Sequence, residues 1–154
     1  MHIQKEDLKK LVMETHNSEL WSRKFFIQGQ KKQDVKLING NIADVISVSI
    51  DSLEGVYDKH LLFKVYKFEE ERITIDSLTI LMSNIRSLSD YLFGRYIEEF
   101  TIYGVLVGPT LFDQEILDFS LCIESERPNI GGISQLQIYT YDYKIDGIHF
   151  KKLY

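Results

Sequence analysis

Histidine and cysteine, the side chains that most often bind zinc or act as nucleophiles, are sparse in this sequence. The histidines are scattered along the chain, whereas a zinc site needs three or four ligands brought together. We therefore interpret them as surface or helix-capping residues: His2, His16, His60 and His149. The single cysteine, Cys122, lies beside Ile123 on the apolar side of an expected helix. We interpret it as a buried and inert thiol.

Glycines and lysines could contact phosphate, but their spacing matches no phosphate-binding loop. Gly108-Pro109 and Gly131-Gly132 lack both the GxxxxGK[ST] and the GxGxxG pattern, so we expect turns there. Two small basic clusters also occur: Lys31 and Lys32 with Lys36, and Lys151 with Lys152. We interpret these clusters as solvated surface, and contact with nucleic-acid phosphates is the alternative.

Three tyrosines near the C-terminal end could form a binding surface. Side chains of a strand alternate between its faces, so Tyr139, Tyr141 and Tyr143 are expected to share one face. One explanation is packing within the core of a sheet. The other is an exposed aromatic strip that anchors a protein partner, because aromatic residues are enriched at interface hot spots.

The charge of the chain favours a protein partner over nucleic acid. The formal net charge is −5, and an acidic surface repels phosphate, so avid nonspecific nucleic-acid binding is disfavoured. An acidic surface also suits a basic partner, such as a nucleic-acid enzyme. Glu69, Glu70 and Glu71 are expected to form a solvated lead-in to a helix, or alternatively an acidic knob for such a partner.

Length and composition predict a single domain over residues 1–154. A chain of this size can bury roughly 68–70% of its unfolded surface, so no structural metal is required and we expect no cofactor. One cysteine excludes an intrachain disulfide and favours a reducing compartment. The N-terminus has no signal-peptide core, and no apolar run approaches the roughly 20 residues of a membrane span. We expect a cytoplasmic protein that does not bind membranes.

The N-terminal half is expected to contain one helix and an antiparallel meander. Apolar residues at helical spacing predict a helix over residues 4–15, followed by a short helical turn through Trp21. A first strand is expected over Phe25–Gln28, either ending there or resuming over Lys36–Ile38 after a polar stretch. Strands over Ile42–Ile50 and His60–Phe68 follow, and Asn39-Gly40-Asn41 is a hairpin turn signal.

The C-terminal half alternates helices with strands. An apolar stripe predicts a helix over residues 74–93, capped by Thr74 and stopped by Gly94. A buried strand over Thr101–Val107, a helix from Thr110 to about Ile123, and a strand over Leu136–Tyr143 follow. A loop over Pro128–Gly132, a turn at Asp146-Gly147 and a tail over His149–Tyr154 complete the chain. Tight loops make the early strands antiparallel, and intervening helices make the later strands parallel to their neighbours.

This order of elements, over residues 5–143, resembles the restriction-endonuclease-like superfamily, the PD-(D/E)xK nucleases. Three local phrases carry the resemblance: GNIADVISVSID, HLLFKVYKF and IYGVLVGPTLFDQEIL. The resemblance implies an α/β (α+β) domain, in which a mixed sheet flanked by helices follows the order helix, antiparallel meander, crossover helix, strand, helix, strand.

The resemblance also implies metal-assisted phosphodiester hydrolysis, in which two acids hold Mg²⁺ and a lysine stabilises developing charge. Asp44 matches the first acid and would be the metal ligand of an active enzyme. The acid-x-Lys pair is broken in both registers: Lys64 replaces the acid in one, and Val65 replaces it when Lys67 is the lysine. We expect Lys64 to face Asp44 as an ion pair that excludes the cation.

Three functions follow as hypotheses. The first is a non-catalytic protein-interaction module on a nuclease-like scaffold. By analogy, it would act in bacterial conflict as an immunity protein, an anti-defence inhibitor or an accessory subunit of a defence complex. The second is a divergent Mg²⁺-dependent nuclease that uses Asp44 with Lys64 or Lys67 and an acid from elsewhere, such as Glu14 or Glu19. The third is a non-catalytic nucleic-acid-binding domain.

Overall fold

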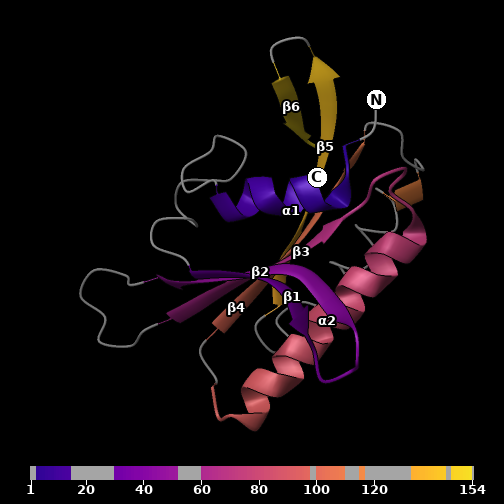
Figure 1. Ribbon diagram of the computed structural model, residues 1–154. Helices are drawn as coiled ribbons and strands as arrows, with labels where there is room; N and C mark the ends of the chain where they lie inside the picture. The colour runs from indigo at the N-terminus through magenta and orange to yellow at the C-terminus, as the bar shows by residue number, and fades with distance from the viewer. Residues whose placement is uncertain are drawn as a thin grey trace.

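The chain forms an α+β domain with a mixed six-stranded sheet and two helices in the part that the computed structural model describes (Figure 1). That part comprises residues 3–14, 30–51, 60–97, 100–109, 115–116, 133–144 and 147–153. The elements follow in this order: α1 (Lys5–Glu14), β1 (Gln30–Lys36), β2 (Ile42–Asp51), β3 (His60–Phe68), α2 (Ile75–Gly94), β4 (Phe100–Pro109), β5 (Ile133–Lys144) and β6 (Gly147–Lys152).

The strands lie in the sheet in the same order as in the sequence, from β1 at one edge to β6 at the other. β1, β2 and β3 form an antiparallel meander, and β3, β4 and β5 run parallel. β6 returns antiparallel to β5. These pairings confirm the expected antiparallel start and parallel continuation. The parallel pair β3–β4 needs a crossover, and α2 supplies it.

The two helices cover opposite faces of the sheet (Figure 1). Successive side chains of a strand point to opposite faces. On β3, Val65 belongs to the apolar cluster under α2, whereas its neighbour Tyr66 belongs to the cluster under α1. Gly104 of β4 faces α2, and a Cβ there would lie 2.6 Å from Cδ1 of Ile85. The absence of a side chain at this position therefore lets the helix approach the sheet closely.

Local signals in the sequence explain where α2 and the β1–β2 hairpin begin and end. Thr74 caps α2: its Oγ1 accepts from the backbone N–H of Ser77 at 3.3 Å, and its own N–H donates to Ser77 Oγ at 3.1 Å. The predicted stop is confirmed, since the helix ends at Gly94. In the hairpin, Gly40 has φ of 89°, a left-handed conformation that glycine adopts without a steric cost. Asn41 N–H donates to Asn39 Oδ1 at 3.0 Å.

The prediction that the polar stretch up to Asp34 interrupts the strand was wrong for the residues that the structure describes. The strand lies over Gln30–Lys36, in the polar stretch that we interpreted as a break. It is an edge strand that pairs only with β2 in the described sheet, and most of its side chains are exposed. Backbone pairing rather than apolar burial holds it, for example at Lys32 opposite Ile46. An edge strand of this kind tolerates charged residues.

The turn expected at Gly108-Pro109 is wrong, because both residues belong to β4 and lie opposite Thr140 and Tyr141 of β5. Most other predicted elements agree with the structure as far as it describes them. The first helix, the strands β2 to β5 and the helix over 74–93 are confirmed. Of the helix expected from Thr110, only Glu115 and Ile116 are described, and both are helical. Several predictions lie outside the described residues: the turn through Trp21, the strand Phe25–Gln28, the loop Pro128–Gly132, Asp146 and Cys122. None of the helices in the described ranges is long and apolar enough to cross a membrane.

Candidate functional site

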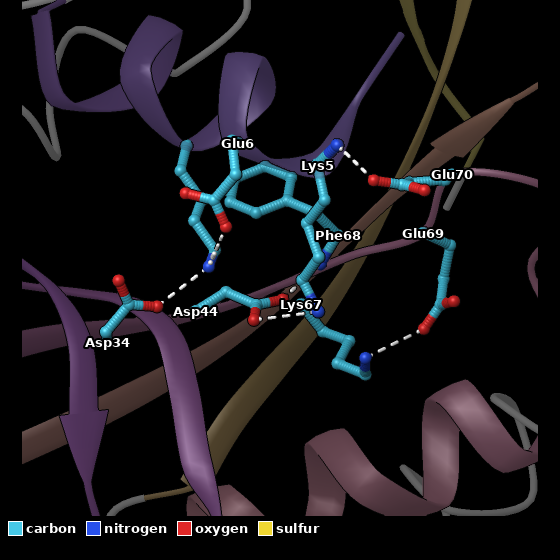
Figure 2. Close-up of polar contacts among 9 residues, drawn as sticks. Lys5, Glu6, Asp34, Asp44, Lys67, Phe68, Glu69 and Glu70 are labelled. Atoms are coloured by element: carbon cyan, nitrogen blue, oxygen red, sulfur yellow. Dashed lines mark hydrogen bonds and ion pairs between the residues drawn. The ribbon is translucent and has the colours of Figure 1, made fainter. Parts of the chain in front are cut away.

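Asp44, the residue that matches the first acid of the nuclease motif, is buried between α1 and the sheet (Figure 2). Its Oδ1 forms an ion pair with Lys5 Nζ of α1 at 2.9 Å. Its Oδ2 accepts a hydrogen bond from the backbone N–H of Phe68 at 2.8 Å. The register of β2 and β3 sets Val45 opposite Tyr66, and Phe68 lies two residues further along β3. A side-chain carboxylate therefore satisfies a buried backbone donor near the end of this strand.

A second buried charge, Lys9, lies one helical turn after Lys5 on α1. Its Nζ contacts Asp34 Oδ1 at 2.7 Å and Glu6 Oε1 at 2.9 Å. Burial alone would lower the pKa of Lys9, but hydrogen bonds to Asp34 and Glu6, with the nearby charge of Asp44, raise it. Asp34 has φ of 54°, a left-handed conformation that Asp tolerates better than most residues. Lys9 thus links α1 to β1, as Lys5 links it to β2.

The acidic run Glu69, Glu70 and Glu71 lies between β3 and α2, where a lead-in to a helix was expected. Two of its three side chains are engaged within the protein. Glu69 Oε1 pairs with Lys67 Nζ at 2.9 Å, and Glu70 Oε1 accepts the backbone N–H of Lys5 at 2.6 Å. Glu70 therefore binds the first turn of α1, where exposed backbone donors favour an anion. Glu71 is exposed.

The prediction that Lys64 pairs with Asp44 is wrong, because Lys5 of α1 forms the ion pair with Asp44. Lys64 lies opposite Ser47, three residues along β2 from Asp44. It is 1% exposed. Burial, followed by the positive charges of Lys152 and Lys31, lowers the pKa of Lys64 to about 7. Lys64 thus lies near two other lysines, whereas the sequence predicted that it pairs with Asp44.

Lys67, the lysine of the other register, does not share a face with Asp44. Alternation along β3 puts Lys67 on the side of Val65, which packs under α2. Its partner Glu69 is on the same side, since the Glu69 Cβ is near Gly108 and the α2-side residue Ile73. The α1 side, in contrast, holds Asp44 and its partner Lys5. Neither lysine of the expected motif therefore contacts the carboxylate of Asp44.

The tyrosines of β5 pack inside the protein. Tyr139 and Tyr141 are 5% and 4% exposed and belong to the apolar cluster under α1. Tyr141 meets Phe150 of β6 edge to face, with ring centroids 6.1 Å apart. An exposed aromatic strip therefore does not form at these two residues, and the core-packing explanation accounts for them. The side chain of Tyr143 lies outside the described residues.

The groups around Asp44 do not fit a bound Mg²⁺. This hard cation needs several oxygen ligands, and the family motif supplies them from a second acid. Here the two oxygens of Asp44 contact an ammonium group and a backbone N–H, and the nearby helix contributes the further cation of Lys9. Within the described ranges, no group of three or more His, Cys, Asp or Glu residues could hold a metal ion. The side chains of Glu14 and Glu19 lie outside those ranges.

Sequence reasoning missed Lys5, which pairs with Asp44, and the nearby ion pair between Lys9 and Asp34. Lys5 and Lys9 are four residues apart, and helical residues at that spacing share a face. Leu8 and Val12 of α1 are buried in the cluster on the same side of the sheet. Two lysines beside the buried stripe of a short helix are the signal that could have indicated buried ion pairs. Asp34 carried no comparable signal.

The chain has no match in three comparisons with known proteins. No family model matches it, and neither a curated protein nor a solved structure shows significant similarity. The architecture therefore defines the class: an α+β domain with a mixed six-stranded sheet between two described helices.

Proposed function

We propose that this protein is a non-catalytic protein-interaction module built on a restriction-endonuclease-like scaffold. It would act in bacterial conflict, as an immunity protein, an anti-defence inhibitor or an accessory subunit of a defence complex. The order of elements supports the scaffold. A helix precedes an antiparallel meander, and α2 crosses over to a parallel strand, as the resemblance implies.

The state of Asp44 is the observation that carries this proposal. A metal ligand must offer a lone pair to the cation, but both oxygens of Asp44 already contact donors of the protein. Releasing them would leave a half-buried ammonium group and a buried N–H without partners, which costs free energy. The carboxylate thus acts as a structural clamp between α1, β2 and β3. Asp44, which would bind the metal in an active nuclease of the resembled family, thus stabilises the fold instead.

Two further features agree with loss of catalysis and with a protein partner. Lys64 and Val65 stand where the two registers of the motif require an acid. The lysines that a nucleic-acid-binding domain would use also have side chains on different sides of the sheet. Lys31 donates to the Val12 carbonyl of α1 at 2.9 Å, whereas Lys36 lines a groove beside α2. Lys64 is buried and not available for a phosphate contact, and Lys31 and Lys36 lie on different sides of the sheet.

The proposal is tested first for catalysis. The purified protein is incubated with DNA and RNA, each single- and double-stranded, in Mg²⁺ or Mn²⁺. We expect no cleavage above that of the Asp44→Asn variant. Asp34→Asn is the matched control, because it removes a carboxylate from the neighbouring strand that the motif does not use. Cleavage that is lost in Asp44→Asn and kept in Asp34→Asn would show a divergent nuclease and overturn the proposal.

The second arm tests binding. The tagged protein is isolated from an extract of its source cells before and after nuclease digestion. We expect a protein partner at a fixed ratio that stays bound after digestion. A complex that dissolves on digestion, and whose affinity falls steeply with salt, would indicate a nucleic-acid-binding domain instead.

A further inference from the structure

β1 lies at one edge of the six-stranded sheet that the structure describes. Among the described strands, β1 pairs with β2 alone, so one side of Gln30–Lys36 has no neighbouring strand. An edge strand offers a row of backbone N–H and C=O groups to any extended segment laid beside it.

An apolar groove of about 430 Å³ runs beside this edge, on the α2 side of the sheet. Leu37 and Ile38, at the end of the β1 segment, form one wall. Ile46 of β2 contributes from the sheet, and Leu88 and Tyr91 of α2 form the other wall. Ile38 is 65% exposed and Tyr91 is 44% exposed. Large apolar side chains are thus gathered where a ligand could cover them.

The edge and the groove have the geometry that strand addition requires. In an added strand, every second side chain would point toward the α2 side, where the groove lies. Main-chain hydrogen bonds to β1 would supply affinity, and the groove would select apolar residues at alternate positions.

The accessible charge on the edge is positive. Lys32 and Lys36 are exposed on β1, and Lys36 lines the groove. The one acid of the strand, Asp34, is paired with Lys9. An added strand with acidic residues would complement Lys32 and Lys36. A second copy of this chain would not, because antiparallel pairing of two β1 strands would bring basic strands together.

We propose that β1 and the adjacent groove bind an extended, acidic segment of a partner protein, which adds to the sheet as a further strand and places an apolar side chain between Ile38 and Tyr91. This inference deepens the proposed interaction module and rests on it. Edge lysines also protect sheets from unwanted pairing. Protection alone, however, does not account for the apolar groove beside them.

The probes are fluorescein-labelled peptides of about eight residues, close to the length of a strand. The first alternates glutamate with isoleucine or valine. A second has the same composition with the acids and the aliphatic residues in separate blocks. A third repeats the first with alternate backbone nitrogens methylated, which removes donors and leaves the charge unchanged. We expect the first peptide to bind by fluorescence anisotropy, and the other two to bind at least about tenfold more weakly.

Matched variants locate the binding surface. Lys36→Glu should weaken binding of the alternating peptide about tenfold, whereas Lys151→Glu, on exposed β6 at the opposite edge, should not change it. Ile38→Asp should also weaken it, whereas Ile80→Asp, which is 42% exposed on α2 outside the groove, should not. These four sites are exposed, so folding should be preserved, and circular dichroism checks this.

Three results would overturn the inference: no binding of the alternating peptide, equal binding of the methylated peptide, or equal weakening by Lys36→Glu and Lys151→Glu. A failure here is distinguishable from failure of the proposed function. If the partner isolated from cells binds Lys36→Glu and Ile38→Asp as tightly as the unaltered protein, the module proposal stands and its surface lies elsewhere.

Discussion

The two faces of the sheet differ in chemistry although both are buried. On the α2 side, the buried cluster consists of apolar residues such as Leu81, Ile85 and Leu106, and the buried polar residues of α2 carry no charge: Ser77, Asn84, Ser87 and Ser89. On the α1 side, aromatic packing is mixed with buried charges, among them Asp44, Lys9 and Lys64. Apolar burial is non-directional and contributes most of the folding free energy. Buried ion pairs contribute little net stability, but a broken pair is costly.

This difference indicates separate roles for the two helices. The aliphatic contact of α2 can be expected to hold the sheet together, since a 20-residue helix covers β3 and β4. The 10-residue α1 is joined to β1, β2 and the β3–α2 turn through Asp34, Asp44 and Glu70. Directional contacts of this kind determine where α1 sits. The polar groups around Asp44 therefore position a helix.

The largest effect is expected from the α2 side. Leu81→Ala removes a fully buried side chain and leaves a cavity, so the free energy of unfolding should fall by about 2–5 kcal/mol. Urea denaturation followed by circular dichroism measures the loss. Ile80→Ala, at the neighbouring and partly exposed position, is the control and should change stability by less than about 1 kcal/mol. A smaller loss for Leu81→Ala than for Asp44→Ala would reverse the comparison between the faces.

Removing the carboxylate on the α1 side should have a smaller effect. Asp44→Ala leaves the Phe68 N–H and the Lys5 ammonium without their acceptor, at a cost of about 1–3 kcal/mol. Asp44→Asn keeps an oxygen that can accept from Phe68, so it should lose less. A double-mutant cycle with Lys5→Met isolates the ion pair. If Asp44→Ala were as stable as the unaltered protein, the clamp would have no structural role.

The buried Lys64 should make the α1 side sensitive to pH. Its pKa is about 7 in the folded protein, against an ordinary value of 10.5. Between these values the unfolded chain holds a proton that the folded protein does not. Stability should therefore rise with pH across this window, by up to about 1 kcal/mol per pH unit, and this contribution should be lost as pH falls toward 7.

Lys64→Met should remove this slope, and Lys151→Met, at an exposed site, should leave it in place. Guanidinium unfolding at several pH values between 7 and 10 measures the difference between each variant and the unaltered protein. An unchanged slope in Lys64→Met would mean that Lys64 does not titrate in this window.

The smallest effect is expected at the solvent-facing end of the α1 contacts. The Glu6 side chain is 73% exposed and pairs with Lys9 at i,i+3. Glu6→Gln should reduce stability by no more than about 0.5 kcal/mol, because exposed ion pairs are screened by water. Asp34→Asn, which weakens the other contact of Lys9, should cost more. Thermal melts at low and high salt measure both, and a loss above 1 kcal/mol for Glu6→Gln would show that the pair is more buried than its exposure indicates.

Much of the fold could be predicted from local pattern, and the site could not. The helix after Thr74 and the strand His60–Phe68 have strong periodicity or a continuous apolar run, so their type and extent were predictable. β1 has neither signal, and its place depends on pairing with β2. Asp44 was identified from its place in the resemblance, but its partner was expected on β3. The carboxylate instead contacts a helix that is 39 residues earlier in the sequence at Lys5.

The sequence by itself determined which segments are helix and strand wherever apolar spacing or a cap decided the matter. Those properties depend on neighbours within a few residues. Only the tertiary structure decided that Lys5, rather than Lys64, neutralises Asp44, that Tyr139 and Tyr141 lie in the core, and that β1 borders a groove. Such contacts depend on the register of strands and on how a helix sits across them, and no local spacing encodes either.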